Sequence, residues 1–155
     1  GRPGLDVVLV MDSSGSMKKT DPGTLRIPAA KLFISLLGEQ DRAGVESFSD
    51  RGYPVIYLSS LEGEKNRKRV LKATEKISSK GLYTNLYDAL QKAFTVLKRA
   101  WVSDREKIVV LMSDGKMDVG DRAKDRELIE KMKRELIPAL KKKKIKVYTI
   151  AFSEF

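Results

Sequence analysis

Oxygen-bearing side chains gather at three places in this sequence. Asp12-Ser13-Ser14-Gly15-Ser16 directly follows an apolar run at residues 5–11, and two smaller groups follow later, Thr84-Asn85 and Ser113-Asp114-Gly115. Carboxylate and hydroxyl oxygens suit hard cations such as Mg²⁺, Mn²⁺ or Ca²⁺ and offer nothing to a soft metal. Each group alone also fits an ordinary helix cap or turn.

The elements that must position these groups alternate between strands and helices. Apolar runs predict strands at residues 5–11, 43–48, 53–58, 107–112 and 145–152. Helical spacing predicts helices at residues 21–38, with Asp21-Pro22 at the start, and at 64–77, 86–101 and 122–143, the last one bent or divided by Pro138. This order predicts an α/β sheet with helices on both faces. The short link between the second and third strands predicts an antiparallel hairpin, and Pro54 places the third strand at a sheet edge.

In an open α/β sheet, binding sites form outside the carboxyl ends of the strands. The three groups lie at or beside such ends, so we expect them to converge on one site. The candidate ligands are Asp12, Ser14, Ser16, Thr84 and Asp114. The alternate spacing of the first three lets a curved loop aim several side chains at one point, and Gly15 permits the tight backbone that this requires.

The pattern Asp12-x-Ser14-x-Ser16, with a later Thr84 and an Asp114 after a hydrophobic strand, resembles the metal-ion-dependent adhesion site of the von Willebrand factor type A domain. The segments VVLVMDSSGSM and KVYTIAFSE look closest to bacterial members, and the resemblance runs from Leu5 to Phe155. It implies a doubly wound, Rossmann-like three-layer sandwich with a mostly parallel sheet, one antiparallel edge strand and the usual strand order 3-2-1-4-5-6. The family's final strand and helix are expected to be missing. We therefore expect residues 1–155 to be a single domain, cut from a larger protein and truncated at its C-terminal end.

The resemblance also implies a function. Ser14 and Ser16 would bind a divalent cation directly, and Thr84 would bind it directly or through water. Asp12 and Asp114 would supply charge, directly or through water. Because these ligands are mostly neutral, the cation would keep a position for an Asp or Glu of a partner protein. We therefore expect a non-enzymatic adhesion or protein-interaction module, with Mg²⁺ as the first candidate and Mn²⁺ or Ca²⁺ as alternatives.

Two alternative functions compete with this one. A phosphohydrolase with Asp12 as its nucleophile would need a second Asp at position 14, where Ser14 stands. A nucleic-acid-binding module is suggested by the net charge of +10, but the exposed aromatic residues that stack on bases are not evident, so we expect no nucleic-acid partner. The absence of histidine and cysteine excludes Ser-His-Asp and Cys-His catalysis within the chain.

The sequence also carries expectations about location and surface. No apolar run approaches the ~20 residues that cross a bilayer, so this segment should not insert into a membrane. The parent protein is nevertheless expected to be extracytoplasmic or membrane-associated rather than cytoplasmic. A second acidic group, Asp118, Asp121 and Asp125, fits a helix N-terminus, with a further cation as the alternative. The strand at 145–152 should be an unpaired edge with an apolar patch beside it, and Lys144 and Lys146 should oppose its pairing.

Overall fold

The structure is a computed structural model that describes residues 3–153, so that Gly1, Arg2, Glu154 and Phe155 lie outside the described residues. Its strands are β1 (Leu5–Asp12), β2 (Arg42–Phe48), β3 (Gly52–Ser60), β4 (Glu106–Ser113) and β5 (Ile145–Ala151). Its helices are α1 (Met17–Thr20), α2 (Arg26–Ser35), α3 (Glu64–Ala73), α4 (Leu86–Arg99), α5 (Arg122–Lys131) and α6 (Ile137–Lys142). A short 3₁₀ turn, η1 (Thr74–Lys76), follows α3, and a π-helical segment, η2 (Met132–Leu136), joins α5 to α6.

The five strands form one sheet in the order β3-β2-β1-β4-β5. β1 pairs in parallel with β2 and β4, β4 pairs in parallel with β5, and only β3 runs antiparallel, against β2. The carboxyl ends of β1 and β2 lie side by side, because Asp12 is in register with Phe48. The predicted strand order and antiparallel edge strand are therefore confirmed, and no strand follows β5 among residues 3–153.

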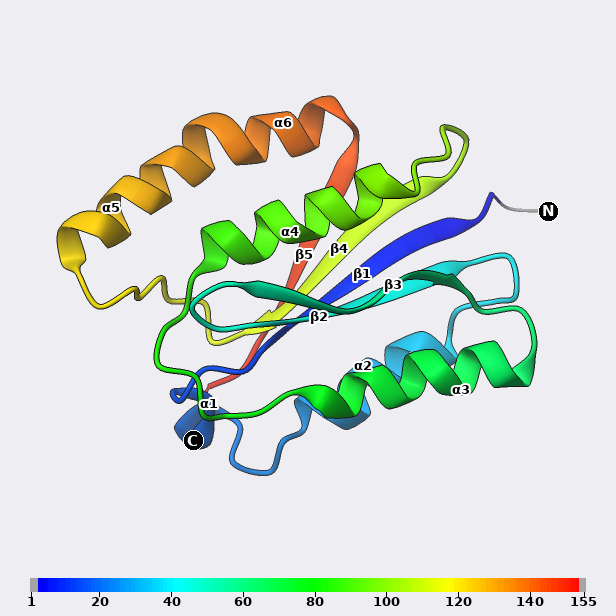
Figure 1. The fold of residues 1–155 in the computed structure, drawn as a ribbon, viewed down its shortest axis with the longest axis horizontal. Coiled ribbons are helices and arrows are strands. Elements are labelled where there is room, and N and C mark those ends of the chain that lie inside the picture. Colours follow the sequence, from blue (N-terminus) through cyan, green and yellow to red (C-terminus); the bar gives the residue numbers. More distant parts are fainter. Residues whose placement is uncertain (1–2, 154–155) are drawn as a thin grey trace.

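Helices cover both faces of the sheet (Figure 1). α4 packs on one face with η2 and α6, and its buried Leu90, Ala93 and Leu97 contact Val8 and Val10 of β1 in one apolar cluster. α2 and α3 cover the other face, where a second cluster holds the alternate β1 residues together with buried residues of both helices. β1 is apolar on both faces because both of its faces are covered. This arrangement is the predicted doubly wound, three-layer sandwich.

The first predicted helix differs from the observed one. The chain forms a single α-helical turn at Met17–Thr20, and α2 begins only at Arg26. Asp21 does not start the helix. Its carboxylate instead accepts hydrogen bonds from the backbone N–H groups of Leu25 and Arg26 across a turn. Asp21-Pro22 therefore lies in the turn before the helix. From this turn the Asp21 carboxylate still satisfies free N–H groups at the start of α2.

The last predicted helix is divided, as expected, but the division starts before Pro138. The π-helical segment spans Met132–Leu136, and Pro138 lies in the first turn of α6. A proline inside a helix removes one N–H donor and crowds the carbonyl four residues earlier, and a wider π turn relieves this crowding.

The predicted apolar patch beside β5 is present. Leu32 and Leu36 of α2 are 64% and 76% exposed, and Tyr148 and Ile150 of β5 are 52% and 38% exposed. A groove between these two elements is lined by Phe33, Ile108, Val110, Tyr148 and Ile150 together with Leu5, Glu106 and Lys146. None of the described helices is long and apolar enough to cross a membrane.

Candidate metal site

The site forms where β1 ends and the chain turns into α1. Asp12 is the last residue of β1 and is fully buried. Its Oδ1 accepts a hydrogen bond from the Ser14 N–H at 2.7 Å, so the carboxylate stabilises the turn that follows β1. Met17, which is also fully buried, anchors the start of α1. The sequence between these two buried residues is held as a tight loop that carries Ser14 and Ser16.

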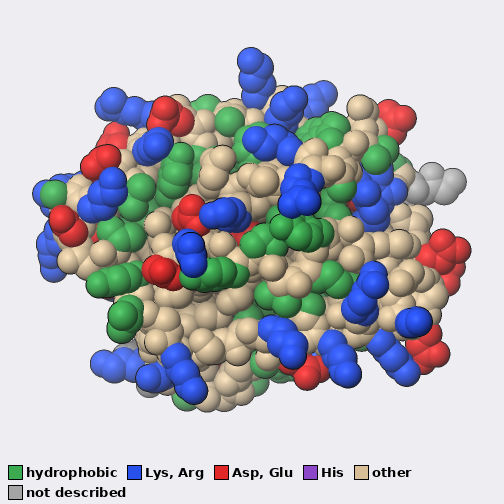
Figure 2. Space-filling view, in the orientation of Figure 1, with side chains coloured by type: hydrophobic (Ala, Val, Ile, Leu, Met, Phe, Trp, Pro, Cys, Tyr) green, Lys and Arg blue, Asp and Glu red, His purple; other side chains and the backbone are tan. Residues whose placement is uncertain are grey.

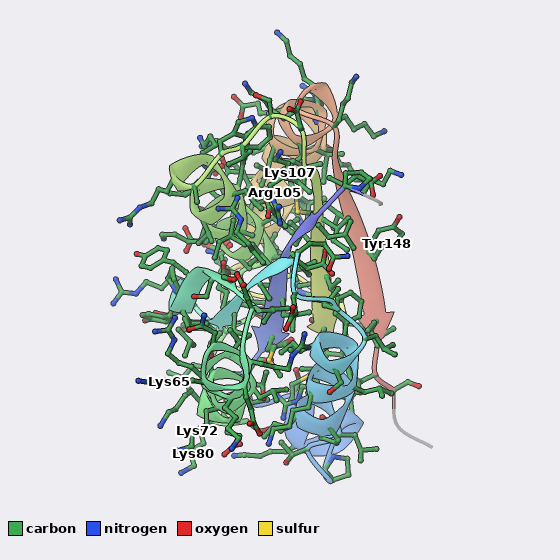
Figure 3. All side chains as sticks on the ribbon, turned by 90° about the vertical axis from the view of Figure 1, so that its right-hand side faces the viewer. Lys65, Lys72, Lys80, Arg105, Lys107 and Tyr148 are labelled. Carbon is green, nitrogen blue, oxygen red and sulfur yellow. The ribbon has the colours of Figure 1, made fainter. Side chains whose placement is uncertain are left out.

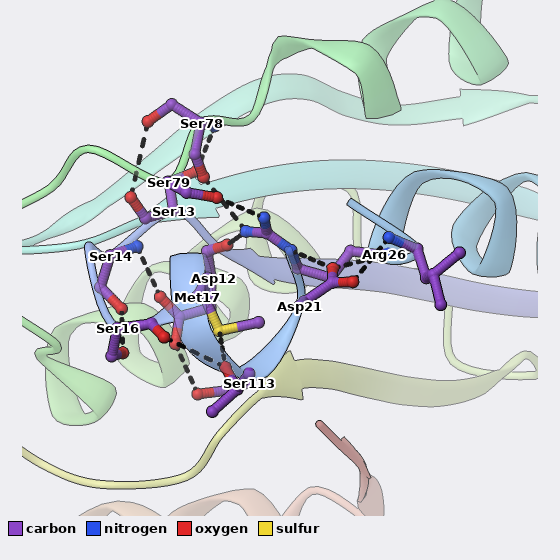
Figure 4. A network of polar contacts seen from close by, with 12 residues as sticks. Asp12, Ser13, Ser14, Ser16, Met17, Asp21, Arg26, Ser78, Ser79 and Ser113 are labelled. Carbon is purple, nitrogen blue, oxygen red and sulfur yellow. Dashed lines mark hydrogen bonds and ion pairs between the residues drawn. The ribbon is translucent and has the colours of Figure 1, made fainter. Parts of the chain in front are cut away.

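The hydroxyl groups of Ser14 and Ser16 converge within this loop. Their Oγ atoms lie 3.0 Å apart (Figure 4). Adjacent ligands of an octahedral Mg²⁺, each at about 2.1 Å from the ion, would stand about 3.0 Å apart. The two hydroxyls hydrogen-bond to each other at this separation, which is also the distance between adjacent ligands of one hard cation.

A second loop is fastened to the first by backbone pairing. The Gly15 N–H donates to the Gly81 carbonyl at 2.6 Å, and the Gly81 N–H donates to the Ser13 carbonyl at 2.9 Å. A Cβ on Gly15 would stand 3.2 Å from the Gly81 carbonyl oxygen, and one on Gly81 would stand 2.0 Å from Ser49 Oγ. Gly15 is therefore favoured by the close approach of two backbones, and its φ is not positive.

Thr84 follows three residues after Gly81 and directly precedes Asn85, the N-cap of α4. It is 5% exposed, and its backbone pairs with Asp118 in both directions, at 2.7 and 3.0 Å. Asn85 caps α4 by accepting a hydrogen bond from the Asp88 N–H at 3.0 Å. Backbone pairing at Gly81 thus connects the loop of Thr84 to the loop of Ser14, while no hydrogen bond joins the Thr84 hydroxyl to Ser14 or Ser16.

The third group meets the first at Asp12. Ser113 Oγ donates to Asp12 Oδ2 at 2.7 Å, and the Gly115 N–H donates back to Ser113 Oγ at 3.0 Å. Asp114, half-buried, comes between these two residues, and its negative charge is near enough to contribute to raising the pKa of Asp12. Burial is the largest cause of that raised pKa, and the hydrogen bonds from Ser14 and Ser113 oppose it.

A buried arginine holds the site from behind. Arg26 has no exposed surface, and its Nη1 donates to the backbone carbonyl of Asp12 and, at 3.1 Å, to that of Ser78 (Figure 4). Its Nη2 donates to Ser79 Oγ at 2.6 Å, and its Nε pairs with Asp21 Oδ2 at 2.8 Å. One guanidinium therefore connects the end of β1 to the loop that leads to Thr84.

Two residues of this arrangement were not expected from the sequence. Ser113 belonged to a recognised group, but nothing in the sequence distinguished its role from that of Asp114. Arg26 occupies a helical position among apolar residues, and its only sequence signal was an acidic residue, Asp21, five positions earlier.

The donor set suits a hard cation. Among residues 3–153 there is no cluster of three or more His, Cys, Asp or Glu side chains that could hold a metal ion. A cation here would therefore depend on hydroxyls and on the two carboxylates. The second acidic group forms no comparable site, because Asp121 caps α5 and Asp118 and Asp125 accept hydrogen bonds from Gly120 and Val119 N–H groups.

Comparisons with known proteins agree with the fold. The sequence model of the von Willebrand factor type A domain family matches residues 7–116 of this chain, and these residues include all five candidate ligands. The calcium-activated chloride channel regulator 1 of Equus caballus is 33% identical over 110 residues, which are 70% of this chain and 12% of that protein. The chain thus spans about an eighth of this curated relative.

Two solved structures have a similar fold. The PilB minor pilin from Streptococcus sanguinis aligns with a TM-score of 0.73 at 18% identity, over 99% of this chain and 51% of that one. A von Willebrand factor type A protein from Catenulispora acidiphila aligns with a TM-score of 0.69 at 19% identity, over 95% of this chain and 33% of that one.

Proposed function

Because the chain belongs to the von Willebrand factor type A family, we propose that it is an adhesion or protein-interaction module that captures an acidic side chain of a partner protein through a divalent cation. Ser14 and Ser16 would hold the cation directly, and Thr84 directly or through water. Asp12 and Asp114 would balance its charge. The observation that carries this proposal is the 3.0 Å separation of the Ser14 and Ser16 hydroxyl oxygens at the end of β1.

Asp12 is placed to act through the loop as well as through its charge. Both of its carboxylate oxygens already accept hydrogen bonds, from the Ser14 N–H and from Ser113 Oγ. These bonds fix the loop while leaving lone pairs for a water molecule. The groups free to bind a cation directly are then mainly neutral hydroxyls.

A neutral ligand set favours a partner that brings its own negative charge. When bound, the cation would keep a positive charge and an open coordination position, which a partner carboxylate can fill. Mg²⁺ fits first, because the hydroxyl separation matches its short ligand distances, with Mn²⁺ and Ca²⁺ as alternatives. The proposal includes no catalytic step, since a Ser14 hydroxyl stands where an acid–base carboxylate would be needed.

We also propose an extracytoplasmic location for the parent protein, membrane-anchored or not. Proteins of similar fold include a minor pilin, a pilus adhesin and a pilus tip protein. Their names support a role on cell surfaces.

Selection of displayed peptides on the immobilised domain would test this function. In Mg²⁺ we expect enrichment of peptides that contain Asp or Glu, and we expect EDTA to elute them. The variant Ser14→Ala/Ser16→Ala should select none of them, whereas Ser35→Ala/Ser103→Ala, which alters two exposed serines outside the site, should behave like the wild type. Selected peptides that lack acidic residues, or that remain bound in EDTA, would contradict the proposal.

A further inference from the structure

β3 is a long outer edge of the sheet. It spans nine residues, Gly52–Ser60, and pairs only with β2. Its sequence, GYPVIYLSS, contains no charged residue, and its one proline is Pro54, near the start. Edge strands are usually protected by charges, prolines or bulges, because their free N–H and C=O groups can pair with another chain. From Val55 onward β3 itself carries neither a charge nor a proline, and its protection is limited to two register shifts against β2, between Ala43 and Val45 and between Val45 and Glu46.

Positive charge is concentrated on the neighbouring helix instead. Residues 65–80, which cover most of α3 and the chain after it, contain seven basic residues and one acidic residue. This segment therefore supplies a net charge of +6 out of the chain's +10. Lys65, Lys72 and Lys80 project outward from this part of the molecule (Figure 3).

Three of these basic residues flank the edge strand. Arg69, Lys72 and Lys76 recur at the spacing of one helix face, and all three are exposed. None of them forms an ion pair with another residue among 3–153, and the nearest acid, Glu75, pairs with Lys31 at 2.7 Å. The Glu75 carboxylate also interacts electrostatically with Lys72 and Lys76, but one carboxylate cannot balance three cations, so the stripe keeps a positive charge that can bind an anion.

A groove lies between the strand and the stripe. It has a volume of about 580 Å³ and is lined by Val55, Ile56, Tyr57 and Ser59 of β3 and by Arg69, Lys72, Ala73 and Lys76 of the helical segment. Figure 2 shows basic side chains along the lower part of this face, over α3, beneath hydrophobic side chains that lie over β3. We call it the β3 groove. No acidic residue lines it.

We propose that the β3 groove binds an extended acidic segment of a partner protein, which adds to β3 as a further strand. The backbone of the segment would pair with the free edge, and its carboxylates would meet Arg69, Lys72 and Lys76. This site is independent of the candidate metal site and of the function proposed for it.

The spacing of the groove fits alternating side chains. In a strand, every second side chain points to the same face, and residues four apart are separated by about 13 Å. Arg69 in α3 and Lys76 in η1 are separated by about 12 Å along the helical axis, which is close to this distance. Tyr57, which also lines the groove, is 47% exposed, and the Arg99 guanidinium of α4 lies 4.4 Å from its ring centroid. The partner would therefore carry acidic residues at alternate positions facing α3.

The groove favours a peptide over a nucleic acid. Its strand side offers aliphatic surface and a free backbone edge, which pair with an extended chain. A phosphate backbone would use only the charges and would bind any basic surface of this protein in a strongly salt-dependent manner.

Fluorescence anisotropy with labelled eight-residue peptides tests the proposal, in the presence of EDTA so that the metal site takes no part. The probe alternates Glu with Thr, and its neutral counterpart alternates Gln with Thr. A third peptide keeps the Glu residues but carries N-methyl groups at alternate positions, which remove backbone donors. We expect the Glu peptide to bind at least about fivefold more tightly than either of the other two.

Variants locate the binding. Lys72→Gln/Lys76→Gln should weaken binding of the Glu peptide about five- to tenfold. Lys141→Gln/Lys142→Gln removes the same charge from exposed positions of α6 and should change the affinity less than twofold. Equal loss in both variants, equal binding of the N-methylated peptide, or displacement of the Glu peptide by a lower concentration of a single-stranded oligonucleotide would overturn the proposal. Failure of metal-dependent binding elsewhere would leave this result unaffected.

Discussion

The guanidinium of Arg26 donates a hydrogen bond to the backbone carbonyl of Asp12, in a position with no exposed surface. The same side chain reaches Ser78 and Ser79, so it joins two loops that backbone pairing also brings together. A planar guanidinium can serve these acceptors at once, whereas an ammonium group cannot match their directions.

Arg26→Lys should therefore destabilise the domain and loosen the site. We expect a loss of about 2–4 kcal/mol in the free energy of unfolding, measured by urea denaturation, because buried acceptors and Asp21 lose their partner. Arg67→Lys is the matched control. Arg67 is only half-buried and donates to two carbonyls, of Ile34 and Leu37, away from the site. Equal stability losses in the two variants would contradict a special role for Arg26.

Ser113→Ala should weaken cation binding while leaving the fold intact. It removes the donor to Asp12 Oδ2 and the acceptor of the Gly115 N–H, which together orient the turn that carries Asp114. Loss of such a supporting hydrogen bond typically lowers metal affinity tenfold or more. We therefore expect calorimetry to give a dissociation constant about tenfold larger than that of the wild type. Ser103→Ala, at an exposed position in another loop, should have no effect. An unchanged affinity in Ser113→Ala would show that the Asp12 carboxylate needs no such support.

Glu46 should make stability depend on pH. This side chain is fully buried in β2, neither of its carboxylate oxygens accepts a hydrogen bond among the described residues, and burial raises its pKa to about 9. Nearby Asp88 raises it further, while Lys92 lowers it. In the folded protein the group is protonated at neutral pH, whereas in the unfolded chain it ionises above its ordinary value of 4.5. Its stabilising effect is therefore complete below about pH 4.5 and is lost as the pH rises toward 9.

Glu46→Gln keeps the neutral shape and removes the titration. We expect the variant to be more stable than the wild type by up to about 3 kcal/mol at pH 7, with a smaller difference at pH 5. Urea denaturation at both pH values measures this change. Glu62→Gln, at an exposed position, serves as the control. A stability difference that does not grow between pH 5 and pH 7 would mean that Glu46 is ionised in the folded protein.

The apolar patch on α2 and β5 should promote self-association. Leu32→Gln/Leu36→Gln changes two side chains that are 64% and 76% exposed, so the stability of the domain should change by less than about 0.5 kcal/mol per site. Sedimentation at high protein concentration should show less association for the variant than for the wild type. A strictly monomeric wild-type protein would contradict this expectation.

The sequence predicted the sheet more fully than the site. Continuous apolar runs such as that of β1 indicate strands covered on both faces, and the short link to β3 indicates an antiparallel edge, so the order of strands followed from general rules. Two of the three groups of oxygen ligands were found because they follow β1 and β4 directly, and the third, Thr84-Asn85, because it stands at the start of a predicted helix. The roles of Arg26 and Ser113 were not predictable, because they depend on contacts between segments 52 and 101 residues apart. The start of α2 was misplaced for a similar reason, since Asp21 caps N–H groups across a turn instead of at the helix start.

Isothermal titration with Mg²⁺, Mn²⁺ and Ca²⁺ tests the central claim, that one divalent cation binds at the loop of Ser14 and Ser16. We expect saturable binding with one site in the wild type, and loss of that binding in Ser14→Ala/Ser16→Ala and in Asp12→Asn with the circular dichroism spectrum preserved. Asp104→Asn, which removes one exposed carboxylate from the loop before β4, should bind like the wild type. Absence of saturable binding in the wild type, or undiminished binding in the folded double serine variant, would contradict the account.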